Sequence, residues 1–342
     1  MTLGNQLVAC AEPLLARYDV AMCDLDGVVY IGGQALPEVA DRLLAARAQG
    51  VRVAFVTNNA SRTPAQVAQH LRDLGIAADA TDIVTSAQAA ARLVAHRVAP
   101  GARVLVVGGE GLRCALLEHG LEPVWSAEHH PAAVVQGFAA DVGWRQLREG
   151  AVAVSRGLPW IATNTDETVP TPRGPAPGNG LLVEVIARTT GARPEVAGKP
   201  EPALFEETLL RVGGRRPLVV GDRLDTDIAG AVRCGVESLL VLTGVTDVLA
   251  LAAAKPGQRP SYISGDLAGL FHPHAAPRRS GPRWCCGGWT VRLDEAEGLR
   301  LDGHGDPEDG LRALVSLCWE HDLHPQHIEA AWRGVGSTAL LP

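Results

Sequence analysis

The sequence predicts an α/β protein built on a doubly wound parallel sheet. Short runs that are apolar throughout (20–23) or apolar except for Arg52 (51–56) are typical of strands buried on both faces of a parallel sheet. Each run is followed by a segment with helical spacing, 37–49 after the first run and 63–75 after the second. The same alternation resumes at 195–242. The stretch between these two parts is therefore predicted to be an inserted domain.

Length and composition limit the classes of protein that the chain can belong to. Its 342 residues exceed the size at which a single core stops growing, about 250–300 residues, so more than one domain is expected. The net charge of −7 gives no electrostatic support to a nucleic-acid partner. No apolar run approaches the roughly 20 residues of a membrane span, and no signal peptide is visible. Seven cysteines, mostly within apolar runs, indicate reduced thiols and hence a cytoplasmic protein.

Caps and breakers mark the elements of the core. Residues 1–17 are expected to form a helix on the edge of the domain. Gly50 ends the helix of 37–49, while Thr63 and Pro64 begin the next helix, which closes at Gly75. After the insertion the core is expected to continue through a helix (203–211), a strand (217–220), a helix capped by 225–227 and ending at Gly235, and a final strand (238–242).

The inserted stretch and the end of the chain have patterns of their own. The insertion is expected to hold strands at 103–107, 134–137 and 160–163, helices at 144–156 and 181–192, and a Pro- and Gly-rich loop at 169–180. The end of the chain is rich in tryptophan and is expected to hold a β-hairpin at 285–301 and helices at 307–321 and 325–332. The expected segments are a core in two parts (1–86 and 195–271), an inserted α/β domain (87–194), a linker (272–283) and a small α+β appendage (284–342).

Polar residues follow the predicted strands at the edge where parallel sheets bind ligands. Asp24 and Asp26 follow the first strand, and their spacing places both carboxylates on one side, where they repel unless a cation lies between them. Gly27 then allows a sharp turn. A carboxylate pair beside a hard divalent ion suits phosphate chemistry, with one carboxylate attacking and the other transferring protons. As an alternative, the Asp-Gly pair forms only a turn that ends the strand.

Three further groups of residues are expected at the same edge. Thr57 ends the second strand and offers a hydroxyl and neighbouring amides for a phosphate. Lys199 is one of only two lysines among the 31 basic residues, so its compact ammonium is a candidate for a specific role. Asp222 and Asp227 follow a later strand, where the alternative interpretation is helix capping.

Taken in order, these motifs resemble those of the haloacid dehalogenase (HAD) superfamily of phosphotransferases. They are Asp-Leu-Asp-Gly-Val-Val-Tyr from Asp24, Thr-Asn-Asn from Thr57, Gly-Lys-Pro around Lys199, and Gly-Asp-x4-Asp-Ile ending at Ile228. The resemblance covers about 18–265 and is specific as a set. It is nearest to the p-nitrophenyl-phosphatase-like branch and to actinobacterial glycerol-3-phosphate phosphatases. It implies a Rossmann-like core whose insertion is a cap domain.

The resemblance also implies roles for individual residues. Asp24 would be the nucleophile that forms an aspartyl phosphate, and Asp26 the general acid and base. Magnesium would be held by Asp24, the backbone carbonyl of Asp26 and Asp222. Asp227 would support these ligands without binding the metal itself. The phosphate would be bound by Leu25, Thr57, Asn58, Asn59 and Lys199. In the cap, Asn164, Asp166 and the turn at 177–180 would select the substrate.

Glycerol 3-phosphate is the substrate expected from this resemblance, and several alternatives stay open. Phosphoglycolate, pyridoxal phosphate and nucleotides are substrates of the same family. A phosphomutase is the nearest enzymatic rival. A sensor of phosphorylated metabolites is the alternative outside enzymes, but Asp26 argues against it because binding alone needs no acid or base. A homodimer through the cap is a hypothesis from the resemblance alone, and the appendage suggests no chemistry.

Overall fold

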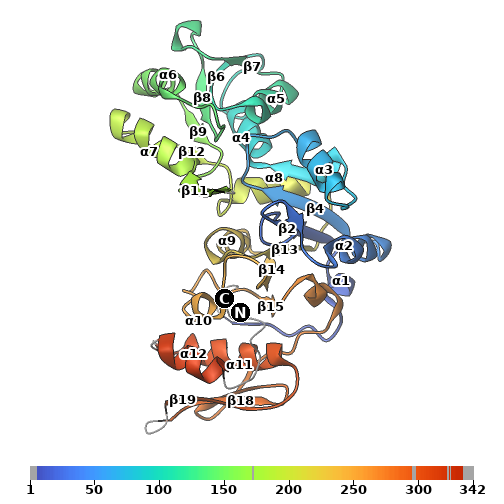
Figure 1. Cartoon of the computed structure of the whole chain (residues 1–342). Coiled ribbons are helices and arrows are strands. Elements are labelled where there is room, and N and C mark those ends of the chain that lie inside the picture. The colour runs from blue at the N-terminus through green and yellow to red at the C-terminus, as the bar shows by residue number, and fades with distance from the viewer. Residues whose placement is uncertain (1–5, 172, 295–297, 322, 324, 334–342) are drawn as a thin grey trace. The chain divides into compact units, whose positions relative to one another are not determined.

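The computed structural model describes residues 6–171, 173–294, 298–321, 323 and 325–333. The chain forms two compact units (Figure 1). The first comprises Met1–Ile31, Leu36–Val53 and Gly214–Pro342, and the second comprises Gly32–Ala35 and Ala54–Gly213. Among the described residues, no helix has the length and apolar character needed to cross a membrane.

Parallel strands form the centre of the first unit. β1 (Val20–Cys23) is buried along its whole length and pairs with β13 (Pro217–Gly221), which pairs in turn with β14 (Glu237–Val241) and then β15 (Tyr262–Ser264). On the other side of β1 the sheet continues with β4 (Arg52–Thr57), whose first residue donates its N–H to the Asp19 carbonyl at 3.0 Å. The predicted parallel α/β fold is confirmed.

Short helices and turns connect these strands. They are α1 (Leu14–Arg17), α2 (Val39–Ala48), the π-helical turn η3 (Leu224–Ile228), α9 (Ala229–Cys234), α10 (Val248–Ala252) and the 3-10 turn η4 (Leu267–Phe271); β2 (Tyr30–Ile31) is a short additional strand. The predicted final strand at 238–242 is β14, but it is not the last, because β15 follows it.

The second unit holds the end of β4, which pairs with β5 (Ile83–Thr85), and a separate parallel sheet. That sheet has the order β12-β9-β8-β6-β7, and residues such as Leu105, Val134 and Ile186 form its core. Its strands are β6 (Arg103–Val107), β7 (Glu122–Val124), β8 (Ala133–Gln136), β9 (Trp160–Ala162) and β12 (Glu195–Val196).

Helices and short elements complete the second unit. The helices are α3 (Pro64–Asp73), α4 (Ser86–Ala95), α5 (Glu110–Glu118), α6 (Trp144–Ser155), α7 (Asn179–Thr190) and α8 (Pro202–Val212). The short elements are β3 (Gln34–Ala35), η1 (Ala80–Asp82) and η2 (Ala127–His129). α3 begins with the predicted cap, because the Thr63 hydroxyl accepts the Gln66 N–H at 3.3 Å.

Two local predictions differ from the structure. Residues 1–5 lie outside the described residues, and within 6–17 only α1 is helical, because Pro13 begins that helix and Cys10 instead forms a β-bridge with His274. The predicted loop at 169–180 contains a hairpin of β10 (Thr168–Thr171) and β11 (Gly174–Pro177). Proline is compatible with such a two-stranded ribbon, since each strand has an edge that needs no N–H donor.

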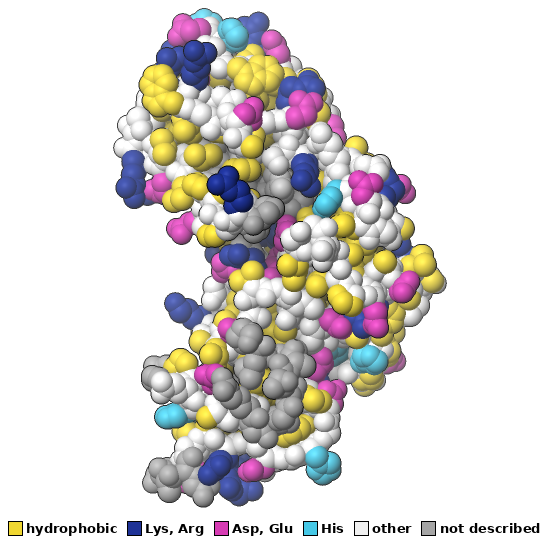
Figure 2. All heavy atoms as spheres, viewed as in Figure 1, with side chains coloured by type: hydrophobic (Ala, Val, Ile, Leu, Met, Phe, Trp, Pro, Cys, Tyr) yellow, Lys and Arg dark blue, Asp and Glu magenta, His cyan; other side chains and the backbone are white. Residues whose placement is uncertain are grey.

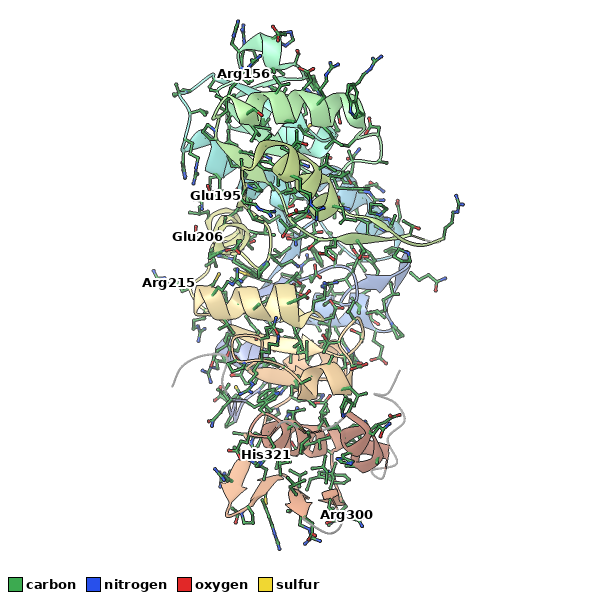
Figure 3. The ribbon with its side chains drawn as sticks, turned by 90° about the vertical axis from the view of Figure 1, so that its left-hand side faces the viewer. Arg156, Glu195, Glu206, Arg215, Arg300 and His321 are labelled. Carbon is green, nitrogen blue, oxygen red and sulfur yellow. The ribbon has the colours of Figure 1, made fainter. Side chains whose placement is uncertain are left out.

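The C-terminal appendage lies in the first unit and has the expected α+β composition. An antiparallel sheet of β16 (Arg278–Ser280), β17 (Arg283–Cys286), β18 (Trp289–Asp294) and β19 (Gly298–Gly303) packs against α11 (Pro307–Cys318) and α12 (Pro325–Arg333). Two residues of the appendage are labelled in Figure 3: Arg300, which lies in β19, and His321, which follows α11. The predicted hairpin and helices are confirmed. The segment predicted as a linker, 272–283, includes β16 and the buried His274.

Acidic and basic side chains are interspersed over the face shown in Figure 2. The described side chains on that face form no basic stripe of the kind that follows a nucleic-acid backbone.

Candidate active site

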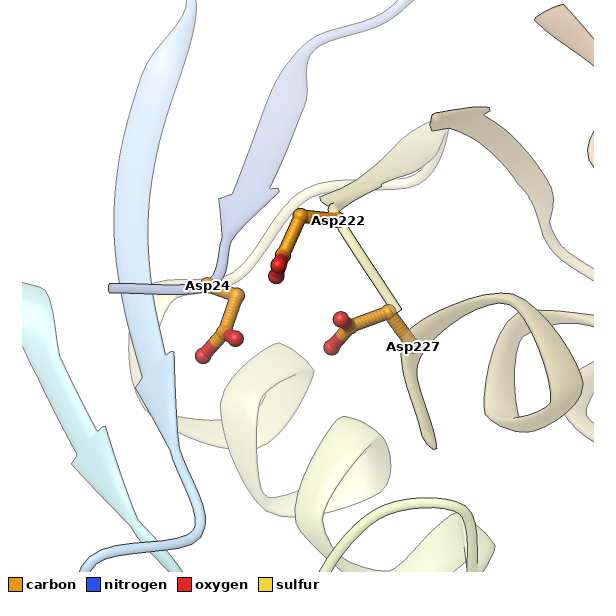
Figure 4. A group of neighbouring side chains, drawn as sticks. All are labelled: Asp24, Asp222 and Asp227. Carbon is orange, nitrogen blue, oxygen red and sulfur yellow. The ribbon is translucent and has the colours of Figure 1, made fainter. Parts of the chain in front are cut away.

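Three carboxylates of the first unit meet at the carboxyl edge of its parallel sheet. Asp24 directly follows β1, Asp222 directly follows β13, and Asp227 lies in η3. Each offers one oxygen atom, and these atoms lie within 4.8 Å of one another. The three side chains point into a common space (Figure 4).

A tight turn after Asp24 determines where the rest of the first motif lies. The carbonyl of Leu25 accepts the N–H groups of Val28, Val29 and Tyr30 at 2.9–3.3 Å, which folds the chain back on itself. Gly27 has φ +85°, and a Cβ atom there would lie 2.4 Å from an Asp222 carboxylate oxygen. Only glycine therefore satisfies both the backbone angle and the close approach of Asp222.

Asp26 differs from the three converging carboxylates in its exposure. Its side chain is exposed, and Tyr30 donates its hydroxyl to Asp26 Oδ2 at 3.4 Å. Leu25, between the two aspartates, is buried and apolar, so only its backbone could contact a phosphate. An exposed carboxyl group beside a less exposed nucleophile candidate is suited to exchange protons with a substrate and with water.

Backbone donors and glycines hold Asp222 and Asp227. Asp222 is fully buried, and its Oδ2 accepts the Val245 N–H at 2.6 Å. A Cβ atom on Gly244 would lie 2.0 Å from the same oxygen. Asp227 is 1% exposed, and its Oδ2 accepts the Arg223 N–H at 3.2 Å. Both carboxylates are therefore fixed by the protein backbone.

This carboxylate set fits a magnesium ion. Mg²⁺ prefers hard oxygen ligands and is usually bound through one or two carboxylates together with waters and substrate phosphate. Three carboxylates brought this close repel one another, and a divalent cation among them removes that repulsion. The predicted ligands Asp24 and Asp222 both belong to the set, and Asp227 also offers an oxygen to it.

In the second unit, the side chain of Asn58 joins two other predicted site residues. Its Oδ1 accepts the Lys199 N–H at 2.8 Å, and its Nδ2 donates to the Lys199 carbonyl at 3.0 Å. The same Nδ2 donates to Asp166 Oδ2 at 3.2 Å. The side-chain amide is thus occupied in placing Lys199 and Asp166.

Lys199 is directed to the end of β4. It is 4% exposed, and its Nζ donates to the Val56 carbonyl at 3.1 Å, one residue before Thr57. A Cβ atom on Gly198 would lie 2.5 Å from Asn58 Oδ1. The glycine before the lysine therefore allows the close contact with Asn58.

The remaining predicted residues are engaged within the protein. Asn59 Oδ1 accepts the N–H and the hydroxyl of Ser61 at 2.9 and 2.7 Å, and the Asn59 N–H donates to Thr57 Oγ1 at 3.1 Å. Asn164 is 4% exposed and donates its Nδ2 to the Asn58 carbonyl at 2.7 Å. These bonds make Asn164 a support of the site from within.

Ser86, Gly244 and Val245 were not singled out by the sequence, whereas Asn179 belongs to the predicted turn at 177–180. Ser86 donates its hydroxyl to the Asn58 carbonyl, and buried Asn179, in the 177–180 turn, donates to the Asn164 carbonyl, each at 2.7 Å. Gly244 and Val245 hold Asp222. A glycine just beyond a strand at the ligand-binding edge was the available signal for Gly244, whereas a single serine gives no comparable pattern.

Cys23, next to Asp24, is not a second nucleophile. Burial raises the pKa of its thiol to about 12, so the thiol stays protonated at neutral pH. All seven cysteines of the chain lack disulfide bonds.

A parallel α/β fold with a carboxylate site for a hard divalent cation is typical of proteins that act on phosphate compounds with the help of a metal ion. Family models agree: haloacid dehalogenase-like hydrolase matches residues 21–122, a HAD-hydrolase-like model matches 196–270, and a GCN5-related N-acetyltransferase-like domain matches 286–335.

Individual relatives point the same way. The chain is 44% identical over 333 residues to a D-glycerol 3-phosphate phosphatase of Mycobacterium tuberculosis, covering 93% of this chain and 92% of the relative. A crystal structure of a glycerol phosphate phosphatase of that organism in complex with magnesium matches with a TM-score of 0.83 at 42% identity, over 91% of this chain and 93% of that one. A p-nitrophenyl phosphatase from Archaeoglobus fulgidus matches with a TM-score of 0.69 at 30% identity, over 74% and 98%.

The chain belongs to the haloacid dehalogenase-like hydrolase family. The predicted superfamily, its p-nitrophenyl-phosphatase-like branch and a hydrolase of the phosphatase type are confirmed. The resemblance seen in the sequence covered only about 18–265, so the appendage lay outside it. The Mycobacterium relative nevertheless matches nearly the whole chain, so the appendage is shared with at least that relative.

Proposed function

We propose that the protein is a magnesium-dependent phosphomonoesterase that hydrolyses glycerol 3-phosphate to glycerol and phosphate. The observation that carries the proposal is the convergence of Asp24, Asp222 and Asp227, which suits a divalent cation and a phosphate together. The substrate is proposed from the relative that is 44% identical along 93% of the chain. When bound, the cation would neutralise charge on the phosphoryl oxygens.

In the first half-reaction, an Asp24 carboxylate oxygen attacks the phosphorus. The oxygen–phosphorus bond to Asp24 forms while the bond between phosphorus and the glycerol oxygen breaks. Asp26 gives its proton to that leaving oxygen, so glycerol departs neutral. The exposed position of Asp26, two residues from Asp24, supports this role.

In the second half-reaction, water hydrolyses the aspartyl phosphate. Asp26, now a carboxylate, takes a proton from the water as its oxygen attacks phosphorus. The bond to Asp24 breaks, which releases phosphate and restores both carboxyl groups to their starting states.

Lys199 and the Thr57 segment are proposed to bind the phosphoryl group. Lys199 would supply positive charge, and the Thr57 hydroxyl with the backbone amide of Asn58 would donate hydrogen bonds, because charge stabilisation and positioning dominate phosphoryl transfer. The Asn59 N–H, by contrast, already donates to Thr57 Oγ1 at 3.1 Å. The hydrogen bonds from the Asn58 side chain to Lys199 support this arrangement.

Asp166 is proposed to select the hydroxylated leaving group. A carboxylate accepts hydrogen bonds from the hydroxyl groups of glycerol, whereas it repels the carboxylate of phosphoglycolate. Asn58 fixes Asp166, and Asn164 Oδ1 accepts the Asp166 N–H at 3.2 Å. We also propose a cytoplasmic location, supported by seven cysteines that form no disulfide bonds, and keep the homodimer as a hypothesis from the resemblance.

The test is phosphate release from glycerol 3-phosphate, phosphoglycolate, pyridoxal phosphate and nucleoside monophosphates, with and without Mg²⁺. Fastest turnover of glycerol 3-phosphate that requires Mg²⁺ would support the proposal. Preference for another compound would reassign the substrate within the family. Binding of these compounds without phosphate release by the folded, magnesium-loaded protein would favour the sensor instead.

A further inference from the structure

The appendage shares a hydrophobic core with the elements that hold the metal-site carboxylates. Buried Ile228, next to Asp227, and buried Val248 and Leu251 of α10 pack in one cluster with appendage side chains. The appendage contributes, among others, Leu311, Leu314, Leu317, Ile328 and Trp332. The hydrophobic core is therefore continuous from the appendage to the surroundings of the carboxylates.

The segment 242–247 connects Asp222 to that core. Its Val245 N–H donates to Asp222 Oδ2 at 2.6 Å, and its Thr246 N–H donates to the Asp222 carbonyl at 3.2 Å. Thr243 donates its hydroxyl to the carbonyl of Gly27, the glycine that lies close to the Asp222 carboxylate. The segment leads directly into α10, whose first turn is capped by Asp247 through a 2.7 Å bond from the Ala250 N–H.

The appendage holds the far end of α10. Trp319, which follows α11, donates its indole N–H to the Leu251 carbonyl at 2.9 Å. Arg259 stacks on the Trp319 ring, with its guanidinium carbon 5.1 Å from the ring centroid, and donates to the Trp319 carbonyl at 3.0 Å. Because α10 is a single short turn, its position depends on these contacts and on the shared core.

A second polar attachment fixes α11 beside the neighbouring strand end. Glu308 Oε1 accepts the Ser264 hydroxyl at 2.8 Å and the Gly265 N–H at 2.6 Å. Arg312 donates to the Ile263 carbonyl at 2.9 Å. These three hydrogen bonds attach α11, and with it the appendage, to the end of β15.

We propose that the appendage positions the metal site, with Trp319 as the positioning residue that acts through α10 and the segment 242–247 on Asp222. The inference rests on the magnesium site of the proposed function. A shift of α10 would move the Val245 N–H that orients the Asp222 carboxylate. Groups that orient metal ligands from outside affect metal affinity in this way.

The test is Mg²⁺ binding in the absence of substrate, measured by isothermal calorimetry and by the rise of the thermal unfolding temperature with Mg²⁺ concentration. In Trp319→Phe, which keeps an aromatic ring but removes the indole donor, we expect Mg²⁺ binding about fivefold weaker, the effect of one hydrogen bond. Leu314→Ala, which opens a cavity in the shared core, should weaken binding by about tenfold.

Two controls separate positioning from stability. Trp284→Phe removes an indole donor of the same appendage that bonds to Glu320 rather than to α10. Leu105→Ala opens a cavity in the core of the other sheet. Both should lower the unfolding temperature without changing the Mg²⁺ dissociation constant.

Unchanged Mg²⁺ binding in folded Trp319→Phe would overturn the positioning role, whatever happens to its stability. An equal loss of Mg²⁺ affinity in Trp284→Phe would also overturn the positioning role of Trp319. If Leu314→Ala does not fold, Mg²⁺ binding by Trp319→Phe still tests the positioning role. Failure of the wild-type protein to bind Mg²⁺ would overturn the proposed function itself, which distinguishes the two failures.

Discussion

The two units hold their candidate site residues by different means. In the first unit, backbone N–H groups and closely packed glycines hold negative carboxylates that repel one another. In the second unit, side-chain amides hold Lys199 and Asp166 in a network of mutual hydrogen bonds. The first cluster gains from a cation, whereas the second is satisfied within the protein. Metal binding and substrate binding should therefore respond to different substitutions.

The largest effect is expected from Asp24→Asn. Loss of the nucleophile should reduce kcat for phosphate release by at least about 10³-fold, since the covalent step cannot occur. Mg²⁺ binding should weaken as well, because one of the three carboxylates is lost. Asp225→Asn is the matched control, since Asp225 lies between Asp222 and Asp227 in the sequence but is exposed and paired with Arg223. Turnover by Asp24→Asn near the wild-type rate would refute the aspartyl-phosphate mechanism.

The next largest effect is expected from Gly27→Ala. Its Cβ would lie 2.4 Å from an Asp222 oxygen, so the carboxylate must move and Mg²⁺ binding should fall by at least about tenfold. Gly50→Ala is a close control because Gly50 has the same φ of +85° with nothing within 4 Å of the added atom. Both variants should lose about 1 kcal/mol through backbone strain. Equal Mg²⁺ binding in the two variants would show that Gly27 serves the turn alone.

Asn58→Ala tests the network of the second unit. It removes the bonds that place Lys199 and Asp166, so we expect kcat/KM for glycerol 3-phosphate to fall by about 10- to 100-fold. Mg²⁺ binding without substrate should be unchanged, which is the opposite pattern to Gly27→Ala. Asn59→Ala is the comparison variant, because its side chain bonds only to Ser61 among the contacts described. Weakened Mg²⁺ binding in Asn58→Ala would contradict the division between the units.

The smallest effect is a pH dependence of stability from His274 in the first unit. Burial lowers the pKa of His274 to about 4, and its Nδ1 accepts from Arg312 at 3.2 Å while its Nε2–H donates to the Gly269 carbonyl at 2.7 Å. Between about pH 6.5 and 4 the unfolded chain binds a proton that the folded chain does not. The contribution of His274 to the free energy of unfolding is therefore fully present above that pH window. Within the window it falls with decreasing pH by at most about 1.4 kcal/mol per pH unit.

Chemical denaturation of wild type and His274→Gln at pH 7.5, 6 and 5 checks this expectation. The wild type should lose more stability than the variant as the pH falls. His272→Gln, an exposed neighbour, should behave as the wild type does. The same pH slope in all three proteins would exclude His274 as the source.

The sequence predicted the parallel fold and the positions of the chemistry-bearing motifs because both depend on local patterns. Buried strands such as 20–23 are recognisable from their apolar runs. Asp24 and Asp222 directly follow strands, and Thr57 is the last residue of one. The sequence did not predict the hairpin at β10 and β11, since proline is read as a breaker without knowledge of its strand partner. It also misjudged 6–13, where pairing of Cys10 with His274 replaces helix.

By itself the sequence determined the family, the candidate nucleophile and acid, and the need for glycine at position 27, because strand periodicity and motif spacing act over a few residues. Only the tertiary structure decided that Asn58 holds Lys199 and Asp166, and that the appendage shares its core with Ile228 and α10. Those contacts join residues separated by about a hundred positions, and no local propensity encodes such pairings. They follow from burial of apolar surface and from the requirement that buried polar groups find partners.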